Sequence, residues 1–417
     1  MRSALRHAEF RRYWAGSLAS YVGYWMAFFI LGWLVVHLAI EDGHPERAPL
    51  YVGFMGLASA VPVISLTLVA GTIADRADLR RILIATQSAL AILSLALATL
   101  TLTGVVSIAH VLVIAAVTSA VQAFDQPTRQ SVLLRIVSRA ELMSAFGLYS
   151  TTFTVSQIVG PALAGLLMIP LGPGPVILFA AVGQTFNALA IASLPAMPPA
   201  PREKGSLLAG VGEGVRFVLA RRSLRWTVLF NGAVSFLARP YHYLLPALAI
   251  GVLGFSAVEL SWLVSAIGVG AVVAALVVAN LDGSRHRATL VYLSSGAAGA
   301  VLVAAGSVTA LPAALAVSLA FGFSLIIFGS LTATAMQLEA PDGLRTRVIS
   351  IYTMFLSGSI PLGQLTLGTL ATSFGLRTVL MASGTVLAVV SLYGAVRMRD
   401  LYLAPRVTPA AGEAVTG

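Results

Sequence analysis

The residues best suited to chemistry lie in an otherwise apolar stretch, ARPYHYLLPALAIGVLG (238–254). Arg239 carries a permanent positive charge suited to carboxylate or phosphate groups, and the imidazole of His242 titrates near physiological pH. Pro240 and Pro246 interrupt backbone hydrogen bonding around them. Arg239 either lines a cavity and meets an anion, or is satisfied by carbonyl groups that the prolines release or by reaching toward water. His242 is either a proton carrier or simply a hydrogen-bonded side chain.

Other polar side chains lie within hydrophobic stretches and are candidates for the same solute or proton pathway. Tyr21 and Tyr24 belong to the first stretch, where they either line a cavity or pack as aromatic residues. Four amides complete the set: Gln122, Asn231, Gln337 and Gln364. Interhelical hydrogen bonding is the ordinary role for any one amide, and a place in the pathway is the functional alternative.

A second cluster, AGTIADRADLRRIL (70–83), places both signs of charge between two long apolar runs. Such charges either form contacts that are made and broken during function, or are ordinary loop charges that contribute little individually. No carboxylate lies in the middle of a hydrophobic run, since Asp125 and Glu259 fall at the ends of theirs. A pump for cationic drugs usually needs such a carboxylate and is therefore disfavoured.

The composition indicates that an integral membrane protein must position these residues. Of 417 residues, 58% are hydrophobic and only 10% are charged, whereas a soluble domain has about a quarter charged. The chain contains no cysteine, which excludes disulfides, a thiol nucleophile and thiolate metal sites. No catalytic constellation is present, so we expect neither an enzyme nor a cofactor or metal. Basic residues confined to short loops indicate membrane orientation rather than nucleic-acid binding.

Twelve apolar runs are long enough to cross a bilayer at roughly 20 residues each. Each should be a helix, because a helix satisfies its own backbone groups in lipid. The expected spans are 14–38, 50–74, 82–103, 105–125, 142–168, 175–194, 226–253, 259–280, 289–306, 311–337, 348–372 and 376–396.

The basic residues predict the orientation. Apart from Arg47, Arg239 and Arg377, the 26 Lys and Arg residues lie in the two tails or in alternate loops. The excess of positive charge marks the cytoplasmic side. We therefore expect a multi-pass membrane protein with both termini on the cytoplasmic side.

The longest connection divides the expected spans into six plus six. Residues 195–225 open with several prolines and continue with apolar residues at helical spacing, which predicts an amphipathic helix on the inner membrane surface. The expected organisation is a six-helix half at 1–194, this linker, a second half at 226–400 and a tail at 401–417. Matches between the halves, such as Tyr149 with Tyr352, favour a duplicated six-helix unit.

The charged cluster resembles the signature of the major facilitator superfamily between its second and third helices. Gly71, Asp75, Arg76 and Arg80 match that signature, while Asp78 stands where the family has a second glycine. With twelve spans and a long central loop, the resemblance covers essentially the whole chain. It implies an all-helical transporter fold of two six-helix halves that rock against each other.

The resemblance also implies a conformational latch on the cytoplasmic side. Asp75 would face the helix that begins near Val348, where unpaired amide groups favour an anion. Arg76 or Arg80 would pair with Asp125 at the end of the fourth span, and these contacts would form in the outward-open state and break in the other. The expected latch residues are Gly71, Asp75, Arg76, Arg80, Asp125 and Arg129.

Two further stretches resemble the bacterial efflux branch that includes the enterobactin exporter. These are residues 121–167 and the stretch around Arg239. Within the first, GPALAG resembles the helix-5 antiporter motif, with Gly160 and Gly165 allowing close packing and Pro161 loosening the helix. A plain packing kink is the alternative for any single one of these residues.

The sequence therefore predicts a secondary transporter that exports a small anionic or neutral solute, with proton exchange as the expected drive and a monomer as the expected state. One alternative is uptake or facilitated movement, for example of an iron complex. Another is a sensor or assembly factor that keeps the fold without transporting. Fold alone does not decide among them.

Overall fold

The computed structural model describes residues 4–74, 77–138, 141–198, 215–280, 287–341 and 344–398, and the regular structure within them is helical. The first half contains η1 (Ala4–Arg6), α1 (Ala8–Glu41), η2 (Pro45–Arg47), α2 (Ala48–Ala74), α3 (Leu79–Leu102), α4 (Ile108–Ile136), α5 (Leu142–Leu171) and α6 (Pro173–Ala192). The second contains α8 (Arg222–Leu237), α9 (Pro240–Pro246), η3 (Ala247–Val252), α10 (Ala257–Ala279), α11 (Arg287–Ser307), α12 (Leu311–Glu339), α13 (Arg345–Phe374) and α14 (Leu376–Arg397).

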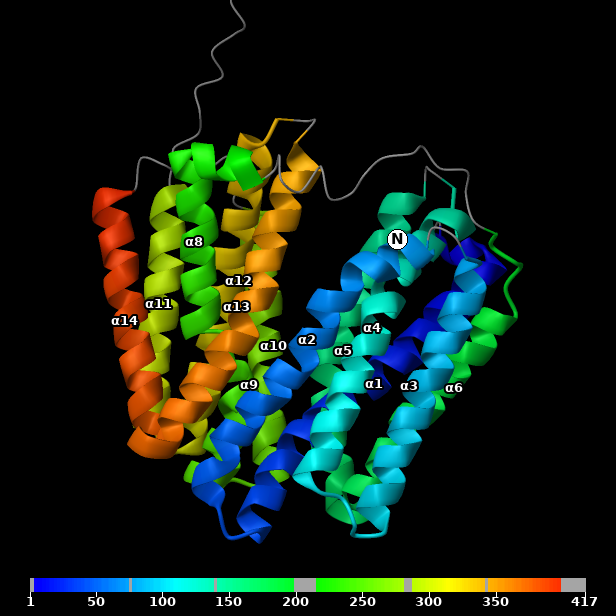
Figure 1. Cartoon of the computed structure of the whole chain (residues 1–417), viewed down its shortest axis with the longest axis horizontal. Helices are drawn as coiled ribbons and strands as arrows, with labels where there is room; N and C mark the ends of the chain where they lie inside the picture. The colour runs from blue at the N-terminus through cyan, green and yellow to red at the C-terminus, as the bar shows by residue number, and fades with distance from the viewer. Residues whose placement is uncertain are drawn as a thin grey trace, which may run out of the picture.

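The helices form two bundles that lie side by side (Figure 1). Helices α1 to α6 make the N-terminal bundle, and α8 to α14 make the C-terminal bundle. Within the described residues, 11 continuous helices are long and apolar enough to cross a membrane. A further crossing, at 222–252, is built from α8, α9 and η3 in succession. The all-helical membrane architecture predicted from the sequence is confirmed, and the span count is consistent with twelve.

The interrupted crossing follows from its two prolines. Pro240 has no N–H to donate, and the next amide, of Tyr241, bonds to the carbonyl of Ala238 at 3.1 Å, three residues back. Pro246 precedes a π-helical turn, in which the amide of Leu253 reaches the carbonyl of Leu248 at 2.9 Å. Arg239 therefore lies at the junction of two helical segments.

Two of the helices extend well beyond the predicted spans. Helix α4 continues to Ile136, well past the predicted end at 125, and α1 starts at Ala8 instead of 14. Asp125 and Arg129 in the extra turns of α4 are buried against neighbouring helices. The hydropathy pattern ends the span at these charges, but the protein itself satisfies them, so the helix continues.

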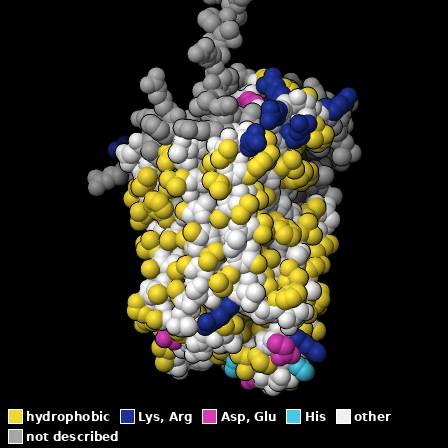
Figure 2. Space-filling view, turned by 90° about the vertical axis from the view of Figure 1, so that its left-hand side faces the viewer, with side chains coloured by type: hydrophobic (Ala, Val, Ile, Leu, Met, Phe, Trp, Pro, Cys, Tyr) yellow, Lys and Arg dark blue, Asp and Glu magenta, His cyan; other side chains and the backbone are white. Residues whose placement is uncertain are grey.

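Charge is concentrated at the two ends of the molecule. We call the end that holds Arg11, Arg12 and Arg81 the basic face, and the other end, which holds Glu46 and Arg377, the opposite face. Figure 2 shows dark blue Lys and Arg side chains gathered at the upper end and a belt of hydrophobic and uncharged atoms below them. This belt fits the hydrocarbon layer of a membrane.

The bundles contact each other through glycines on α2, α5, α10 and α13. A Cβ on Gly53 would lie 2.9 Å from the Cα of Leu365, and one on Gly368 would clash with the backbone of Pro49. A Cβ on Gly165 would overlap Ser261. These contacts lie between the membrane middle and the opposite face, so the described helices hold the bundles together on that side.

Several expectations concern segments outside the described residues. Of the linker predicted at 195–225, residues 199–214 lie outside, while 215–220 are helical with Val218 buried. The tail predicted at 401–417 also lies outside the described residues. The predicted boundaries of the halves, linker and tail remain predictions.

Candidate functional site

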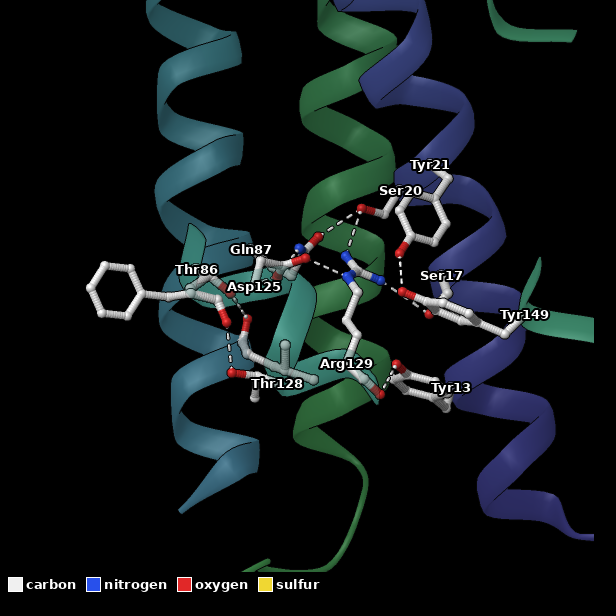
Figure 3. Close-up of polar contacts among 12 residues, drawn as sticks. Tyr13, Ser17, Ser20, Tyr21, Thr86, Gln87, Asp125, Thr128, Arg129 and Tyr149 are labelled. Atoms are coloured by element: carbon white, nitrogen blue, oxygen red, sulfur yellow. Dashed lines mark hydrogen bonds and ion pairs between the residues drawn. The ribbon is translucent and has the colours of Figure 1, made fainter. Parts of the chain in front are cut away.

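A buried ion pair lies at the centre of the N-terminal bundle (Figure 3). Arg129 donates through Nε to the Oδ2 atom of Asp125, one turn earlier on α4. The side chains of both residues are 1% exposed. Charges taken out of water must be paired and hydrogen-bonded, because the cost of desolvating them is large. The surrounding polar residues supply that compensation.

A closed cycle of hydrogen bonds joins the pair to α1 and α3. Gln87 donates through Nε2 to Oδ1 of Asp125 at 2.7 Å and accepts at Oε1 from the hydroxyl of Ser20, also at 2.7 Å. Ser20 in turn accepts from Nη2 of Arg129 at 3.3 Å. The cycle fixes both charged groups relative to α1 and α3 (Figure 3).

Further contacts complete the shell around the pair. Thr86 donates to Oδ1 of Asp125 at 2.7 Å, and Ser17 accepts from Nη1 of Arg129 at 3.2 Å. The guanidinium carbon of Arg129 lies 4.7 Å from the centre of the Tyr21 ring, in cation–π contact. The Tyr21 hydroxyl is hydrogen-bonded to that of Tyr149. Tyr21, predicted for the solute pathway, is thus part of this cluster.

Asp125 and Arg129 were predicted from the sequence, but the residues that hold them were not. Ser17, Ser20, Thr86 and Gln87 carry no signal in the sequence beyond being polar residues in apolar runs. The pair itself had a readable signal, because opposite charges four residues apart face each other on a helix.

The predicted alternative pairing of Arg80 with Asp125 is not formed in this conformation, and the other predicted partner, Arg76, lies outside the described residues. Arg80 donates instead to the carbonyl of Ala192 at the end of α6. Asp125 is already paired with Arg129 on its own helix. Asp78, which departs from the family signature, caps α3 by accepting from the amide of Arg80 at 2.9 Å, and also accepts from the amide of Met197 at 3.2 Å.

The remaining latch residues receive only partial description. Asp75 and Arg76 lie outside the described residues, and Gly71 is in the last turns of α2. The described partners of Arg80, Asp125 and Arg129 all belong to the N-terminal bundle. The latch therefore remains a proposal, and in this conformation these three residues do not bridge the bundles.

A cavity of about 300 Å³ lies between the bundles, near the middle of the helices. Its wall is largely apolar with a few polar groups, as small-molecule sites commonly are. The N-terminal bundle contributes Tyr24, Phe28, Met55, Ser94 and Gln184, and the C-terminal bundle contributes Tyr243, Ser357 and Gln364. The structure thus places Tyr24 and Gln364 of the predicted pathway in the cavity wall. Gln87 of the buried cycle lies one turn from Leu90, which also lines the cavity.

Arg239 and His242 are not among the residues that line this cavity, but they are close in sequence to one that does. Tyr243, which lines it, is one turn beyond Arg239 and one residue beyond His242. The Nε atom of Arg239 is buried, and within the described residues the guanidinium makes no hydrogen bond or ion pair. The carbonyls released by the prolines therefore do not satisfy it. The His242 ring lies edge-on to Tyr243, with centroids 5.4 Å apart.

The other predicted pathway amides are not in the cavity wall. Asn231 is fully buried, accepts from the Tyr352 hydroxyl at 3.3 Å and leaves its Nδ2 atom without a described partner. Gln122 lies between the cavity residue Ser119 and Asp125, with its buried Oε1 atom likewise unpartnered. Gln337 is exposed in the last turns of α12, toward the basic face.

The predicted helix-5 residues lie at two different contacts of α5. A Cβ on Gly160 would lie 2.6 Å from the Cβ of Trp25, so this glycine packs α5 against α1 within its own bundle. Gly165 packs against Ser261 and Ala257 of α10, in the other bundle. Pro161 lies between them in a helix that is continuous from Leu142 to Leu171.

Replacing Gly165 by valine is expected to separate the bundles at the opposite face, because a branched side chain cannot fit against Ser261. Spin labels on Thr103 and Ser307, both exposed, should report a longer distance than in the parent protein. The absence of native cysteine makes such labelling specific. Gly147→Val on the same helix is the control, since a Cβ there meets nothing within 4 Å. Identical distances in both variants would show that this contact does not hold the bundles together.

These features define a class: a multi-pass membrane transporter whose two helical bundles meet around a central cavity. The chain belongs to the family described as transmembrane secretion effectors, within the major facilitator superfamily, whose model matches residues 2–403. The family and its relatives are transporters and not enzymes.

Relatives of known activity include exporters. The enterobactin exporter EntS of Shigella boydii is 30% identical over 221 residues, which are 52% of this chain and 52% of that protein. The chain thus matches about half the length of the enterobactin exporters. The multidrug efflux pump Tap of Mycolicibacterium fortuitum is 26% identical over 366 residues, 84% of this chain and 88% of that protein.

Solved transporters share the fold at low identity. A bacterial homolog of the human lysosomal transporter Spinster, in an inward-facing and unoccupied conformation, superposes with a TM-score of 0.73 at 14% identity, covering 96% of this chain and 98% of that one. The nucleoside transporter NupG gives 0.74 at 12% identity, with 94% and 99% covered. At these identities the likeness concerns the fold alone.

Proposed function

We propose that this protein exports a small anionic or neutral solute across the bacterial inner membrane in exchange for protons. In this mechanism the basic face is cytoplasmic, both termini lie on that side, and the working unit is a monomer. The cavity is exposed to each side in turn as the bundles rock about their contacts. The observation that carries the proposal is the cavity itself, whose wall is shared by both bundles. The named activities of EntS and Tap support export as the direction.

The proton site in this proposal is Asp125. A buried carboxylate that pairs with an arginine can exchange that partner for a proton when the surrounding helices move. Its shell reaches α1 and α3, which also line the cavity through Tyr24 and Leu90, so motion around a solute can be transmitted to the pair. His242 is the other predicted proton carrier. Its ring contacts Tyr243 but has no described hydrogen bond to another helix.

Transport into proteoliposomes tests the function. With candidate anionic and neutral solutes on one side, an imposed pH gradient should drive at least one of them against its concentration gradient. Flux that ignores the pH gradient would instead indicate facilitated movement or coupling to another ion. A purified, folded protein that moves none of the solutes under any gradient would support a sensor or assembly role.

The latch is proposed to act at the cytoplasmic side, and replacing Asp75 by asparagine is expected to cripple turnover while leaving insertion intact. The asparagine side chain lacks the negative charge that the unpaired backbone N–H groups at the start of the facing helix would favour. Initial rates in proteoliposomes measure the effect. Asp78→Asn is the matched control, because asparagine remains a good helix cap and turnover should stay near normal. Normal rates in well-inserted Asp75→Asn protein would rule the latch out.

A further inference from the structure

Three polar residues on α8 and its break form a row of unsatisfied groups. Asn231 and Ser235 are four residues apart and lie on one side of α8, and Arg239 follows four residues later, at the break after α8. Asn231 and Ser235 are fully buried. Asn231 Nδ2, Ser235 Oγ and Arg239 Nε each lack a hydrogen-bond partner among the described residues. Leaving such groups buried without partners costs free energy, so their persistence points to a ligand that accepts hydrogen bonds.

The charge of Arg239 makes an anion the fitting ligand. Within the described residues no carboxylate pairs with it. Gly329 faces the guanidinium, with Nη2 only 3.6 Å from the position a Cβ would occupy, so no side chain of that residue covers the charge. A carboxylate or similar group would supply the missing acceptor and form a charge-assisted, bidentate pair of hydrogen bonds with the guanidinium.

Three aromatic rings line the part of the cavity that includes Tyr243. Tyr243, one turn from Arg239, meets Phe28 of the other bundle edge-to-face at 5.9 Å, and Phe28 stacks with Tyr24 at 6.4 Å. All three rings line the cavity. Aromatic rings pack well against another ring, edge-to-face or offset. A guanidinium one turn from such a wall is suited to a ligand with an acidic group at one end and a flat apolar body.

We propose that the solute is an aromatic anion, whose acidic group binds Arg239 and whose ring lies among Tyr24, Phe28 and Tyr243. This inference rests on the proposed function, since it names the class of solute that the transporter carries. Ser235, four residues before Arg239, supplies a further hydroxyl. Phe28 and Tyr243 come from different bundles, so the ring of the solute would contact both.

Calorimetric titration of the purified protein in detergent at neutral pH tests the site without transport. Benzoate and benzamide are matched probes, because they share a ring and a planar group and differ in charge. Benzoate should bind about tenfold tighter or more, as expected for a charge-assisted hydrogen bond. Arg239→Gln should remove that preference. Arg239→Lys should restore only part of it, since the planar fork is lost.

Arg377→Gln, which removes an arginine at the opposite face, is the matched control and should keep the full preference. Thermal unfolding of each variant confirms that it is folded before titration. Equal binding of benzoate and benzamide to the parent protein, or a preference that survives Arg239→Gln, would overturn the inference. Either outcome leaves transport of a neutral solute intact, so it is distinguishable from failure of the proposed function, which proteoliposome flux measures separately.

Discussion

Replacing Arg129 alone by glutamine is expected to lower the free energy of unfolding by about 3–5 kcal/mol, because it leaves the buried charge of Asp125 uncompensated. Asp125 is buried, and its remaining donors, Thr86 and Gln87, are neutral. Titration with SDS in mixed micelles, followed by the loss of helix signal, measures the change.

Arg135→Gln is the matched control for this loss. Arg135 lies on the same helix six residues further on and is exposed. Its replacement should change the free energy of unfolding by less than about 0.5 kcal/mol, as is usual for surface positions. If Arg129→Gln were no more destabilising than Arg135→Gln, the charge of Arg129 would not be needed to compensate the buried carboxylate of Asp125.

The double variant Asp125→Asn with Arg129→Gln is expected to recover most of the lost stability and to lose proton coupling. Neutral amides of similar shape leave no buried charge behind, and replacing both members of a buried pair is often close to neutral. Without a carboxylate at this site the protein has nothing there to protonate. Solute exchange down a concentration gradient should continue, whereas flux driven by a pH gradient should fall to the rate of empty vesicles.

His242→Gln distinguishes between Asp125 and His242 as the proton carrier. The variant should keep gradient-driven flux, because His242 has no described link to the Asp125 cluster. If the double variant keeps gradient-driven flux and His242→Gln loses it, the proton site is in the C-terminal bundle and not at Asp125.

The architecture was largely predictable from the sequence, and its departures have physical causes. Hydropathy locates the spans because lipid demands helices of a fixed length. It fails at α4, where Asp125 and Arg129 are satisfied by other side chains and the helix runs on to Ile136. Hydropathy does not show the break after Leu237, but Pro240 and Pro246 predict it, because Pro240 cannot make a backbone hydrogen bond.

The candidate site was predictable only in part. Arg239, Tyr24 and Gln364 stand out as polar or aromatic groups in apolar runs, and the structure places the last two in the cavity wall and Arg239 one turn from it. The hydrogen-bond partners of the buried charges were harder to predict, because the sequence alone does not show that α1 brings Ser17 and Ser20 to Arg129. The resemblance to a latch predicted Arg76 or Arg80 as the partner of Asp125, whereas in this conformation Asp125 pairs with Arg129 on its own helix.

Central to the proposed mechanism is the exchange of solute leaving the cell for protons at Asp125. The most direct test loads proteoliposomes with a transported solute and a pH-sensitive dye, then dilutes them into solute-free buffer at equal pH. We expect the interior to become more acidic as solute leaves, because each outward step draws protons inward. The double variant should release solute with no such change. Solute efflux from the parent protein without internal acidification, or acidification that persists in the double variant, would contradict proton exchange at this carboxylate.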